Sequence, residues 1–266
     1  MMNLVRLPSY IQFGPLQIHF YALCILTGAL IAYILGVRRF KQLGYGEPLI
    51  SEFSDYFIYL LLIGILGARL WYVVFEWRQY AAHPEEILMI WHGGLAIHGG
   101  IVAAVIYSYL FFKKHGVPFL VAGDAIMPGV LIAQACGRWG NFFNQEAYGS
   151  EVSLSFLKSL HLPSWLINNM FIQGAYHHPT FLYESLANVC LFLIIVLIIR
   201  RFAKHHGVQF FSYFIGYGLV RFPIEAMRTD SLMIGPLKMA QVTSIAFILI
   251  GIIGMLYVHF KGDLIQ

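Results

Sequence analysis

Six ionisable side chains stand inside stretches of the chain that are otherwise apolar. They are Arg69, His98, Asp124, Glu184, Arg221 and Glu225. An ionisable group inside a hydrocarbon layer costs about 2.5 kcal/mol or more on insertion scales, so each is a candidate for function. Pairing of opposite charges inside a helix bundle is the structural alternative, and Arg221 and Glu225 have the spacing for it.

One apolar stretch carries four polar side chains at helical spacing. Tyr217, Arg221 and Glu225 recur every fourth residue, and Arg228 follows three residues later. A helix would therefore align a phenol, two guanidinium groups and one carboxylate on a single face. Two arginines with one carboxylate leave net positive charge for a phosphate, although a structural ion pair has the same spacing. Pro223 removes a backbone donor there, which favours a polar spot beside Arg221.

The longest polar motif covers residues 137–149 and reads GRWGNFFNQEAYG. It brings together a guanidinium (Arg138), two amides (Asn141 and Asn144) and a carboxylate (Glu146) in what we interpret as a glycine-punctuated turn. Such a turn would present backbone donors and a bidentate arginine to an anionic phosphodiester. An ordered loop whose Asn side chains cap their own turns is the alternative.

Two HGG triplets, at residues 92–94 and 98–100, precede another apolar stretch. Paired glycines allow close approach of backbone or ligand, and histidine is suited to proton transfer near neutral pH. A histidine that is only hydrogen-bonded is the alternative. The sequence has no metal-ligand spacing, GxSxG elbow or P-loop, so we expect no metal and no cofactor.

Composition defines the surroundings of these groups. Of the 266 residues, 59% are hydrophobic and only 11% are charged, whereas soluble domains have roughly 25% charged residues. This excludes a soluble globule, and a net charge of +4 spread along the chain is not typical of nucleic-acid binding. We predict an all-α membrane protein that forms one integral membrane domain over residues 1–266.

Apolar stretches long enough to cross about 30 Å of hydrocarbon predict seven transmembrane helices. They cover approximately residues 18–37, 57–75, 95–112, 120–136, 181–199, 210–224 and 242–260. Pro128 and Pro223 favour a tilt, a kink or a partly re-entrant course in the two short spans. Lys and Arg follow alternate spans, so the positive-inside rule places the N-terminus outside and the C-terminus in the cytoplasm. Residues 137–179, between spans four and five, form a small extracytoplasmic cap.

These motifs together resemble the prolipoprotein diacylglyceryl transferases of bacteria. Residues 137–149 fit the family pattern G-R-x-G-N-F-x-N-x-E-x-x-G throughout. Further matches are GLAIHGG at residues 94–100, HPTFLYE at 178–184 and GLVRFPIEAMRTD at 218–230. The resemblance covers nearly the whole chain.

The resemblance implies a reaction and a location. The diacylglyceryl group of phosphatidylglycerol would pass to the sulfur of the lipobox cysteine in a prolipoprotein signal peptide, forming a thioether and releasing glycerol 1-phosphate. The protein would cross the bilayer of the bacterial plasma membrane several times, with its active site toward the outer leaflet.

The resemblance also implies roles for particular residues. Arg138 would bind the lipid headgroup, Arg221 would assist the departing phosphate, and His98 matches a proposed catalytic base. His92 also precedes two glycines, but the spacing after GL favours His98. The substrate site would further include Tyr21, Gly99, Gly100, Asn141, Glu146, Gly149 and Tyr217.

The chemistry of the implied reaction favours the arginines over the histidine. Displacement of a phosphate by a thiolate needs a deprotonated sulfur and charge stabilisation on the leaving oxygens, and two arginines could serve both needs. The main rival is a lipid or small-anion transporter that uses the same arginines as a transient site. A structural partner of the secretion machinery is a weaker rival.

Overall fold

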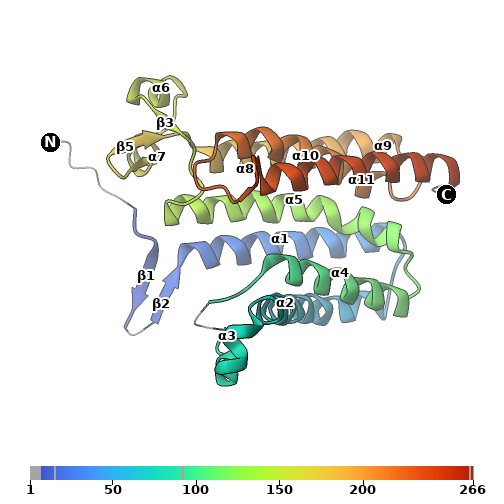
Figure 1. Cartoon of the computed structure of the whole chain (residues 1–266). Helices are drawn as coiled ribbons and strands as arrows, with labels where there is room; N and C mark the ends of the chain where they lie inside the picture. The colour runs from blue at the N-terminus through green and yellow to red at the C-terminus, as the bar shows by residue number, and fades with distance from the viewer. Residues whose placement is uncertain (1–6, 15, 91–92, 264, 266) are drawn as a thin grey trace. The chain divides into compact units, whose positions relative to one another are not determined.

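The structure, a computed structural model, describes residues 7–14, 16–90, 93–263 and 265, and it consists mainly of α-helices (Figure 1). The chain divides into two compact units. Unit 1 comprises Met1–Gly36 and Gly123–Gln266, and unit 2 comprises Val37–Ala122. The long helices are α1 (Phe20–Gln42), α2 (Leu49–Phe75), α4 (Ile97–Lys114), α5 (Phe119–Asn144), α8 (Thr180–Leu193), α10 (Val208–Met227) and α11 (Met239–Lys261).

Unit 1 contains α5, α8, α10, α11 and the first part of α1. The π-helical segment η3 (Ile194–Ile199) and α9 (Arg200–Phe202) continue α8 without a break. Glycines allow the closest helix contacts: a Cβ atom on Gly28 of α1 would lie 2.8 Å from the Cα atom of Ala133 in α5. A Cβ atom on Gly218 of α10 would lie 2.7 Å from the carbonyl oxygen of Ser244 in α11. Small residues at such crossings are typical of helix packing in membranes.

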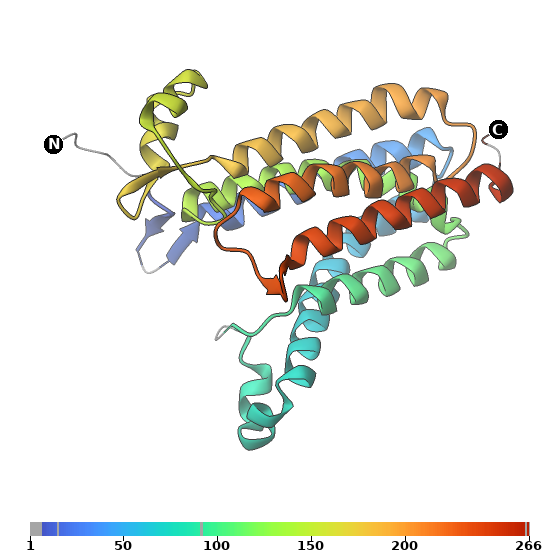
Figure 2. The ribbon, with the colours of Figure 1, turned by 45° about the horizontal axis from the view of Figure 1, so that its top comes forward.

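A small folded insert connects α5 to α8 (Figure 2). Its elements are β3 (Glu151–Val152), α6 (Leu154–Ser159), α7 (Ser164–Asn169), β4 (Phe171–Ile172) and β5 (Ala175–His177). The strands form an antiparallel sheet in the order β3-β5-β4. Leu157, Leu166 and Met170 of the insert are buried together with Phe142 of α5 and Phe181 of α8. The apolar core of the insert therefore fixes it to the ends of both helices.

Two β-hairpins complete unit 1. The first pairs β1 (Tyr10–Phe13) with β2 (Leu16–His19), immediately before α1. The second pairs β6 (Met233–Ile234) with β7 (Leu237–Lys238), between α10 and α11.

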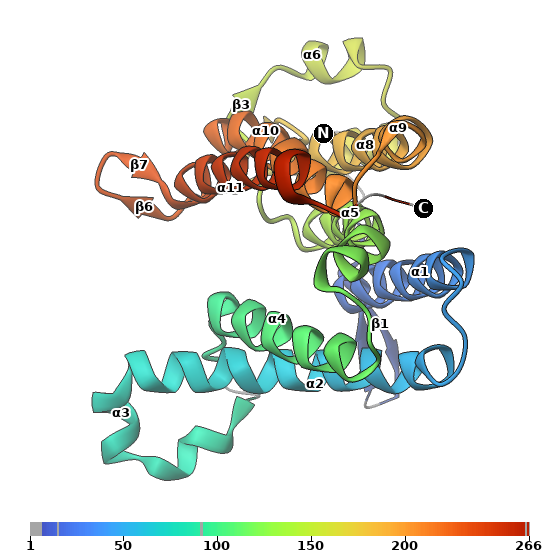
Figure 3. The ribbon, with the colours of Figure 1, turned by 90° about the vertical axis from the view of Figure 1, so that its right-hand side faces the viewer.

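In unit 2, α2 packs along α4 (Figure 3), and the short helices α3 (Trp77–Ala82) and η1 (Pro84–Leu88) follow α2. Glycines again set the helix spacing, because a Cβ atom on Gly100 would lie 3.0 Å from the carbonyl oxygen of Gly64. Phe40, Phe53 and Phe112 pack ring against ring elsewhere in the unit.

Two of the six ionisable groups, Arg69 and Asp124, form hydrogen bonds with backbone groups. The buried Arg69 guanidinium donates hydrogen bonds of 2.6–2.9 Å to the carbonyl oxygens of Glu86, Ile87, Gly93 and Gly94.

Asp124 accepts hydrogen bonds from the backbone N–H groups of Gly207 (2.7 Å) and Phe210 (2.8 Å). Because these N–H groups stand at the start of α10, Asp124 acts as its cap. Both side chains therefore have structural partners, but these are backbone groups rather than the opposite charges that the structural alternative expected.

Each expected span corresponds to a helix. Within the part of the chain that the structure describes, five helices are long and apolar enough to cross a membrane: α1, α2, α5, the continuous helix Thr180–Phe202 and α11. The expected spans at residues 95–112 and 210–224 correspond to α4 and α10, which lie outside this group. Neither α5 nor α10 breaks at its proline, and they have 26 and 20 residues, so both are longer than expected.

The boundary of the connection after α5 differs from the expectation. The turn predicted from residue 137 onward is wrong for its first part, because α5 continues to Asn144. One of the glycines that suggested a turn, Gly140, permits close helix packing instead, since a Cβ atom on it would lie 2.6 Å from the ring of Tyr21 in α1. The connection between α5 and α8 therefore begins after Asn144 rather than at Gly137.

Candidate active site

Two arginines from different helices converge on one buried carboxylate. Glu184, in the first turns of α8, places one oxygen 2.7 Å from Nη2 of Arg138 in α5 and the other 2.8 Å from Nη1 of Arg221 in α10. The hydroxyl group of Tyr217, one turn before Arg221, lies 3.5 Å from the oxygen that binds Arg138. Three helices thus meet at a single point, with two guanidinium groups held by one anion.

Two hydrogen bonds join α5 to α8 beside these ion pairs. The indole N–H of Trp139 donates to the hydroxyl oxygen of Ser185 (3.2 Å), and that hydroxyl donates to the carbonyl oxygen of Ala135 (3.0 Å). Trp139 follows Arg138 in the sequence, and Ser185 follows Glu184. These bonds therefore fix the position of Arg138 relative to Glu184 along the two helices.

A chain of ion pairs extends from Arg221 toward the end of α10. Arg221 also pairs with Glu225, as the spacing of four residues predicts. Nη1 of Arg228 lies 3.7 Å from the same Glu225 oxygen, while Nε and Nη2 of Arg228 each donate to a carboxylate oxygen of Asp230 at 3.0 Å. Burial alone would raise the pKa of Asp230, but the hydrogen bonds and charge of Arg228 outweigh it, so that pKa lies below its ordinary value.

The charge balance of this cluster corrects the sequence expectation. Two arginines with one carboxylate were expected to leave net positive charge, whereas Arg138, Arg221 and Arg228 face Glu184, Glu225 and Asp230. The expectation was wrong because the additional carboxylates come from α8 and from the segment after α10. An anionic ligand must therefore compete with a carboxylate for the guanidinium groups.

Lys238 of β7 closes the carboxyl end of α10. Its ammonium group donates to the carbonyl oxygens of Glu225 (2.9 Å), Ala226 (3.1 Å) and Arg228 (2.6 Å). A cation at this position satisfies the free carbonyl groups and interacts favourably with the helix dipole. The β6–β7 hairpin thus fixes the turn that carries Glu225 and Arg228.

The segment after α5 is tied to the same end of α10. Gly149 forms an isolated β-bridge with Arg228, and its N–H donates to the carbonyl oxygen of His178 (3.1 Å). A Cβ atom on Gly149 would lie 2.7 Å from Cβ of His178, so a side chain does not fit here. The N–H of Ala147 donates to Asp230 (3.2 Å). Gly149 therefore links the 137–149 motif, through its backbone, to the residue that follows α10.

The expected site residues of unit 1 occupy different positions around the cluster. Asn141 accepts a hydrogen bond from Nη1 of Arg138 (3.2 Å), and Tyr217 contacts Glu184. Tyr21 packs against Gly140, one turn before Asn144. The carboxylate of Glu146 is exposed and accepts from the amide of Asn144 (3.3 Å) rather than from an arginine.

The remaining expected residues lie in unit 2, on the first turn of α4. His98 is exposed, whereas Gly99 is buried. Gly99 and Gly100 face α2, where their missing side chains allow close packing against Trp71 and the Gly64 backbone. His92, the alternative histidine, lies outside the residues that the structure describes.

Comparison with known proteins identifies the family. The family model for prolipoprotein diacylglyceryl transferase matches residues 8–257. The chain belongs to this family.

Curated relatives carry the name phosphatidylglycerol–prolipoprotein diacylglyceryl transferase. The Bacillus cereus strain B4264 protein is 48% identical over 243 residues, which is 91% of this chain and 88% of the relative. The Bacillus anthracis strain CDC 684 protein is 47% identical over the same shares.

In this member of the diacylglyceryl transferase family, Glu184, Asp230 and Lys238 take positions that the sequence did not assign to them. Glu184 was visible as an ionisable residue in an apolar stretch, but its sharing between two helices was not. Asp230 ends the 218–230 motif but was given no role there, and Lys238 lies outside both the motifs and the apolar stretches.

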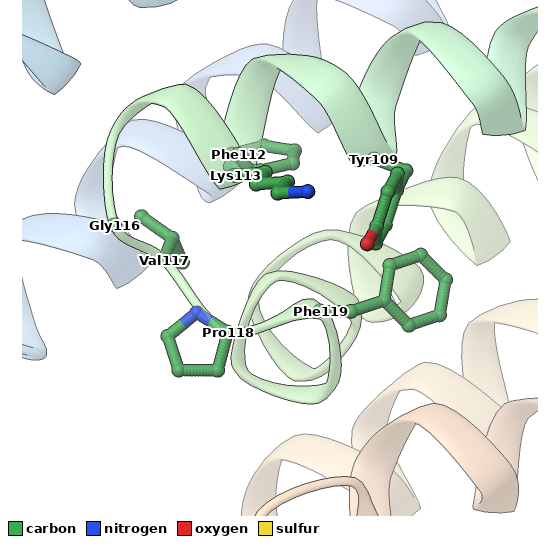
Figure 4. A pocket seen from close by; sticks show the side chains of 7 residues that line it. All are labelled: Tyr109, Phe112, Lys113, Gly116, Val117, Pro118 and Phe119. Carbon is green, nitrogen blue, oxygen red and sulfur yellow. The ribbon is translucent and has the colours of Figure 1, made fainter.

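A separate cavity of about 320 Å³ lies in unit 2, where α4 ends and α5 begins (Figure 4). Its charged side chain is Lys113, whose ammonium nitrogen lies 5.8 Å from the ring centre of Tyr109. The residues that line it are Tyr109, Phe112, Lys113, Gly116, Val117, Pro118 and Phe119. None of these is an expected site residue, and none belongs to the arginine cluster.

Proposed function

We propose that the protein transfers the diacylglyceryl group of phosphatidylglycerol to the cysteine thiol of a prolipoprotein. The products are a thioether-linked lipoprotein precursor and glycerol 1-phosphate. The observation that carries the proposal is the convergence of Arg138 and Arg221 on one anion-binding point. Guanidinium groups bind phosphate through planar, paired donors, which suits a phosphodiester headgroup.

The proposed chemistry follows from this geometry. The phosphodiester takes the position between the two guanidinium groups that Glu184 occupies in the structure. Arg138 binds the headgroup phosphate with Asn141 as its support, and Arg221 neutralises the charge that develops on the leaving oxygen. The thiolate of the lipobox cysteine attacks the glyceryl carbon, and the carbon–oxygen bond to phosphate breaks. Tyr21, Glu146, Gly149 and Tyr217 complete or support the lipid site in this proposal.

The proposal includes seven crossings of a bacterial plasma membrane, with α4 and α10 added to the five long apolar helices. The N-terminus is outside and the C-terminus is cytoplasmic. Support comes from the basic residues that follow alternate helices, such as Lys113 and Lys114 at the end of α4 and Arg200 and Arg201 in α9. The arginine cluster then faces the outer leaflet, and the insert between α5 and α8 is an extracytoplasmic cap.

The direct test is a reconstitution with two substrates. Purified protein receives phosphatidylglycerol labelled in its diacylglyceryl group and a signal peptide with a lipobox cysteine. We expect a thioether-linked peptide and an equal amount of glycerol 1-phosphate. A wild-type protein that moves labelled lipid between leaflets without forming the thioether would be a transporter and would contradict the proposal.

His98→Ala is expected to slow turnover by about tenfold or less. His98 enters the proposed site through its sequence motif, and one hydrogen bond to a bound substrate contributes about 0.5–1.5 kcal/mol, which corresponds to roughly a tenfold effect at most. The measurement is kcat and KM for thioether formation. Because the imidazole is exposed, the variant should fold as the wild type does. Complete loss of activity in a folded variant would instead make His98 an essential group.

A further inference from the structure

Glu184 occupies an unusual position for a carboxylate in an anion-binding site. It is buried, and each of its two oxygens binds a different arginine of the proposed phosphate site. Among the side chains that the structure describes, it is the carboxylate that contacts both guanidinium groups. It therefore holds Arg138 and Arg221 at the spacing of two donors around one oxyanion.

A phosphodiester that binds these arginines must displace Glu184. The donors that would bind phosphate oxygens, Nη2 of Arg138 and Nη1 of Arg221, are the ones that hold the carboxylate. A carboxylate that loses cationic partners inside a protein gains affinity for a proton. Lipid binding thus creates a proton acceptor at the place where the thiol must lose its proton.

The surroundings of Glu184 can receive both the ionised and the protonated carboxyl group. Asn188 follows Glu184 by four residues in α8 and so lies on the same helix face, one turn further along. Its side chain is fully buried, and neither its Nδ2 nor its Oδ1 atom has a hydrogen-bond partner in the described part of the chain. Nδ2 can donate to a carboxylate, and Oδ1 can accept from a carboxylic acid.

The other groups that face Glu184 do not compete for this role. Arg138 from α5 and Arg221 from α10 are permanently charged donors. The hydroxyl of Tyr217 lies 3.5 Å from a Glu184 oxygen, and Tyr213 stands one turn before it, bound to the amide of Gln134 at 3.0 Å. Both phenols can relay or stabilise charge, but an ordinary phenol ionises only near pH 10.

We propose that Glu184 is the catalytic proton acceptor for the substrate thiol and that phosphatidylglycerol activates it by taking over its arginines. The inference rests on the proposed transferase function. The S–H bond breaks with its proton passing to Glu184, and the sulfur electron pair forms the S–C bond. The C–O bond to phosphate breaks, and its electrons remain on the phosphate oxygen between Arg138 and Arg221. Glu184 returns its proton to the departing phosphate or to water and binds the arginines again.

The first experiment is Glu184→Gln, which keeps the shape of the side chain but removes the charge that competes with lipid. We expect kcat for thioether formation to fall by roughly a hundredfold or more, while KM for phosphatidylglycerol stays the same or decreases. If Glu184 only positions the arginines, KM should rise instead and kcat should change little.

A selenocysteine peptide separates proton removal from every other role. A selenol is already ionised at neutral pH, so it needs no proton acceptor. With the lipobox cysteine replaced by selenocysteine, we expect the difference between wild type and Glu184→Gln to shrink to less than tenfold. Glu225→Gln is the matched control, because it removes a carboxylate from Arg221 but not from Arg138. Its activity relative to wild type should be equal with both peptides.

Asn188→Leu provides an independent variant that does not alter the arginine contacts. It should lower kcat with the cysteine peptide more than with the selenocysteine peptide, while raising the unfolding temperature because an unpaired buried amide has been removed. A Glu184→Gln defect that persists with selenocysteine, or a His98→Ala defect that selenocysteine abolishes, would overturn the assignment. Absence of thioether product in wild type would instead refute the proposed function itself.

Discussion

Replacement of Arg138 or Arg221 by Lys is expected to lower kcat/KM for thioether formation by at least about a hundredfold. Lysine keeps the charge but not the planar pair of donors. Arg138 uses two nitrogens at once, Nη1 on Asn141 and Nη2 on Glu184, and Arg221 likewise binds Glu184 and Glu225. An ammonium group cannot reproduce either fork, so the bound phosphodiester loses orientation as well as contact.

The same assay distinguishes the two arginines. Arg221→Lys should act mainly on kcat, since Arg221 is proposed to stabilise the departing phosphate, whereas Arg138→Lys should also raise KM for the lipid. The matched control is Arg78→Lys, at an exposed residue of α3, which should leave kcat and KM unchanged. Thermal unfolding establishes that each variant is folded. Near-normal turnover in either site variant would remove that arginine from the mechanism.

Arg69→Met is expected to cause the largest loss of stability. The substitution removes four hydrogen bonds from one guanidinium group to backbone carbonyl oxygens, those of Glu86, Ile87, Gly93 and Gly94. The carbonyl of Glu86 keeps a second donor, the N–H of Met89 at 3.0 Å. A hydrogen bond from a charged donor contributes about 1.5–3 kcal/mol, so we expect the loss of four of them to lower the free energy of unfolding by at least about 3 kcal/mol. Hydrogen exchange should increase first in residues 86–90 and 93–96, because this guanidinium binds the carbonyl groups at both places.

Two further variants test the cause of that loss. Arg69→Lys should recover part of the stability, because a single ammonium group can bind three carbonyl oxygens, as Lys238 does at the end of α10. Arg78→Met removes an exposed arginine from the same unit and should change the free energy of unfolding by less than about 0.5 kcal/mol. Unchanged hydrogen exchange in the Arg69→Met variant would mean that other contacts hold the segment.

Features that depend on neighbouring residues in one helix were predictable from the sequence. The apolar stretches located every long helix, and the spacing of four residues predicted the ion pair between Arg221 and Glu225. The 137–149 motif and its companions identified the family. Each of these depends on local periodicity or on consecutive residue types, which the linear chain contains in full.

Features that depend on contacts between helices were not predictable in the same way. Glu184 was one ionisable residue among six, and only the contact of α8 with both α5 and α10 makes it the shared partner of Arg138 and Arg221. The same holds for Asp124, which caps α10 from a helix more than eighty residues away in sequence. The turn expected from residue 137 is likewise replaced by helix up to Asn144, and within that helix Gly140 packs closely against Tyr21 of α1.

The amino-acid sequence by itself determined which groups the chain has for phosphate chemistry and which helix carries each of them. The tertiary structure decided how the charges are balanced, because a side chain's periodicity defines the face on which it lies but not the helix that this face meets. That choice depends on side-chain volumes at helix crossings, and it pairs each arginine of the cluster with at least one carboxylate where the sequence predicted an excess of arginine.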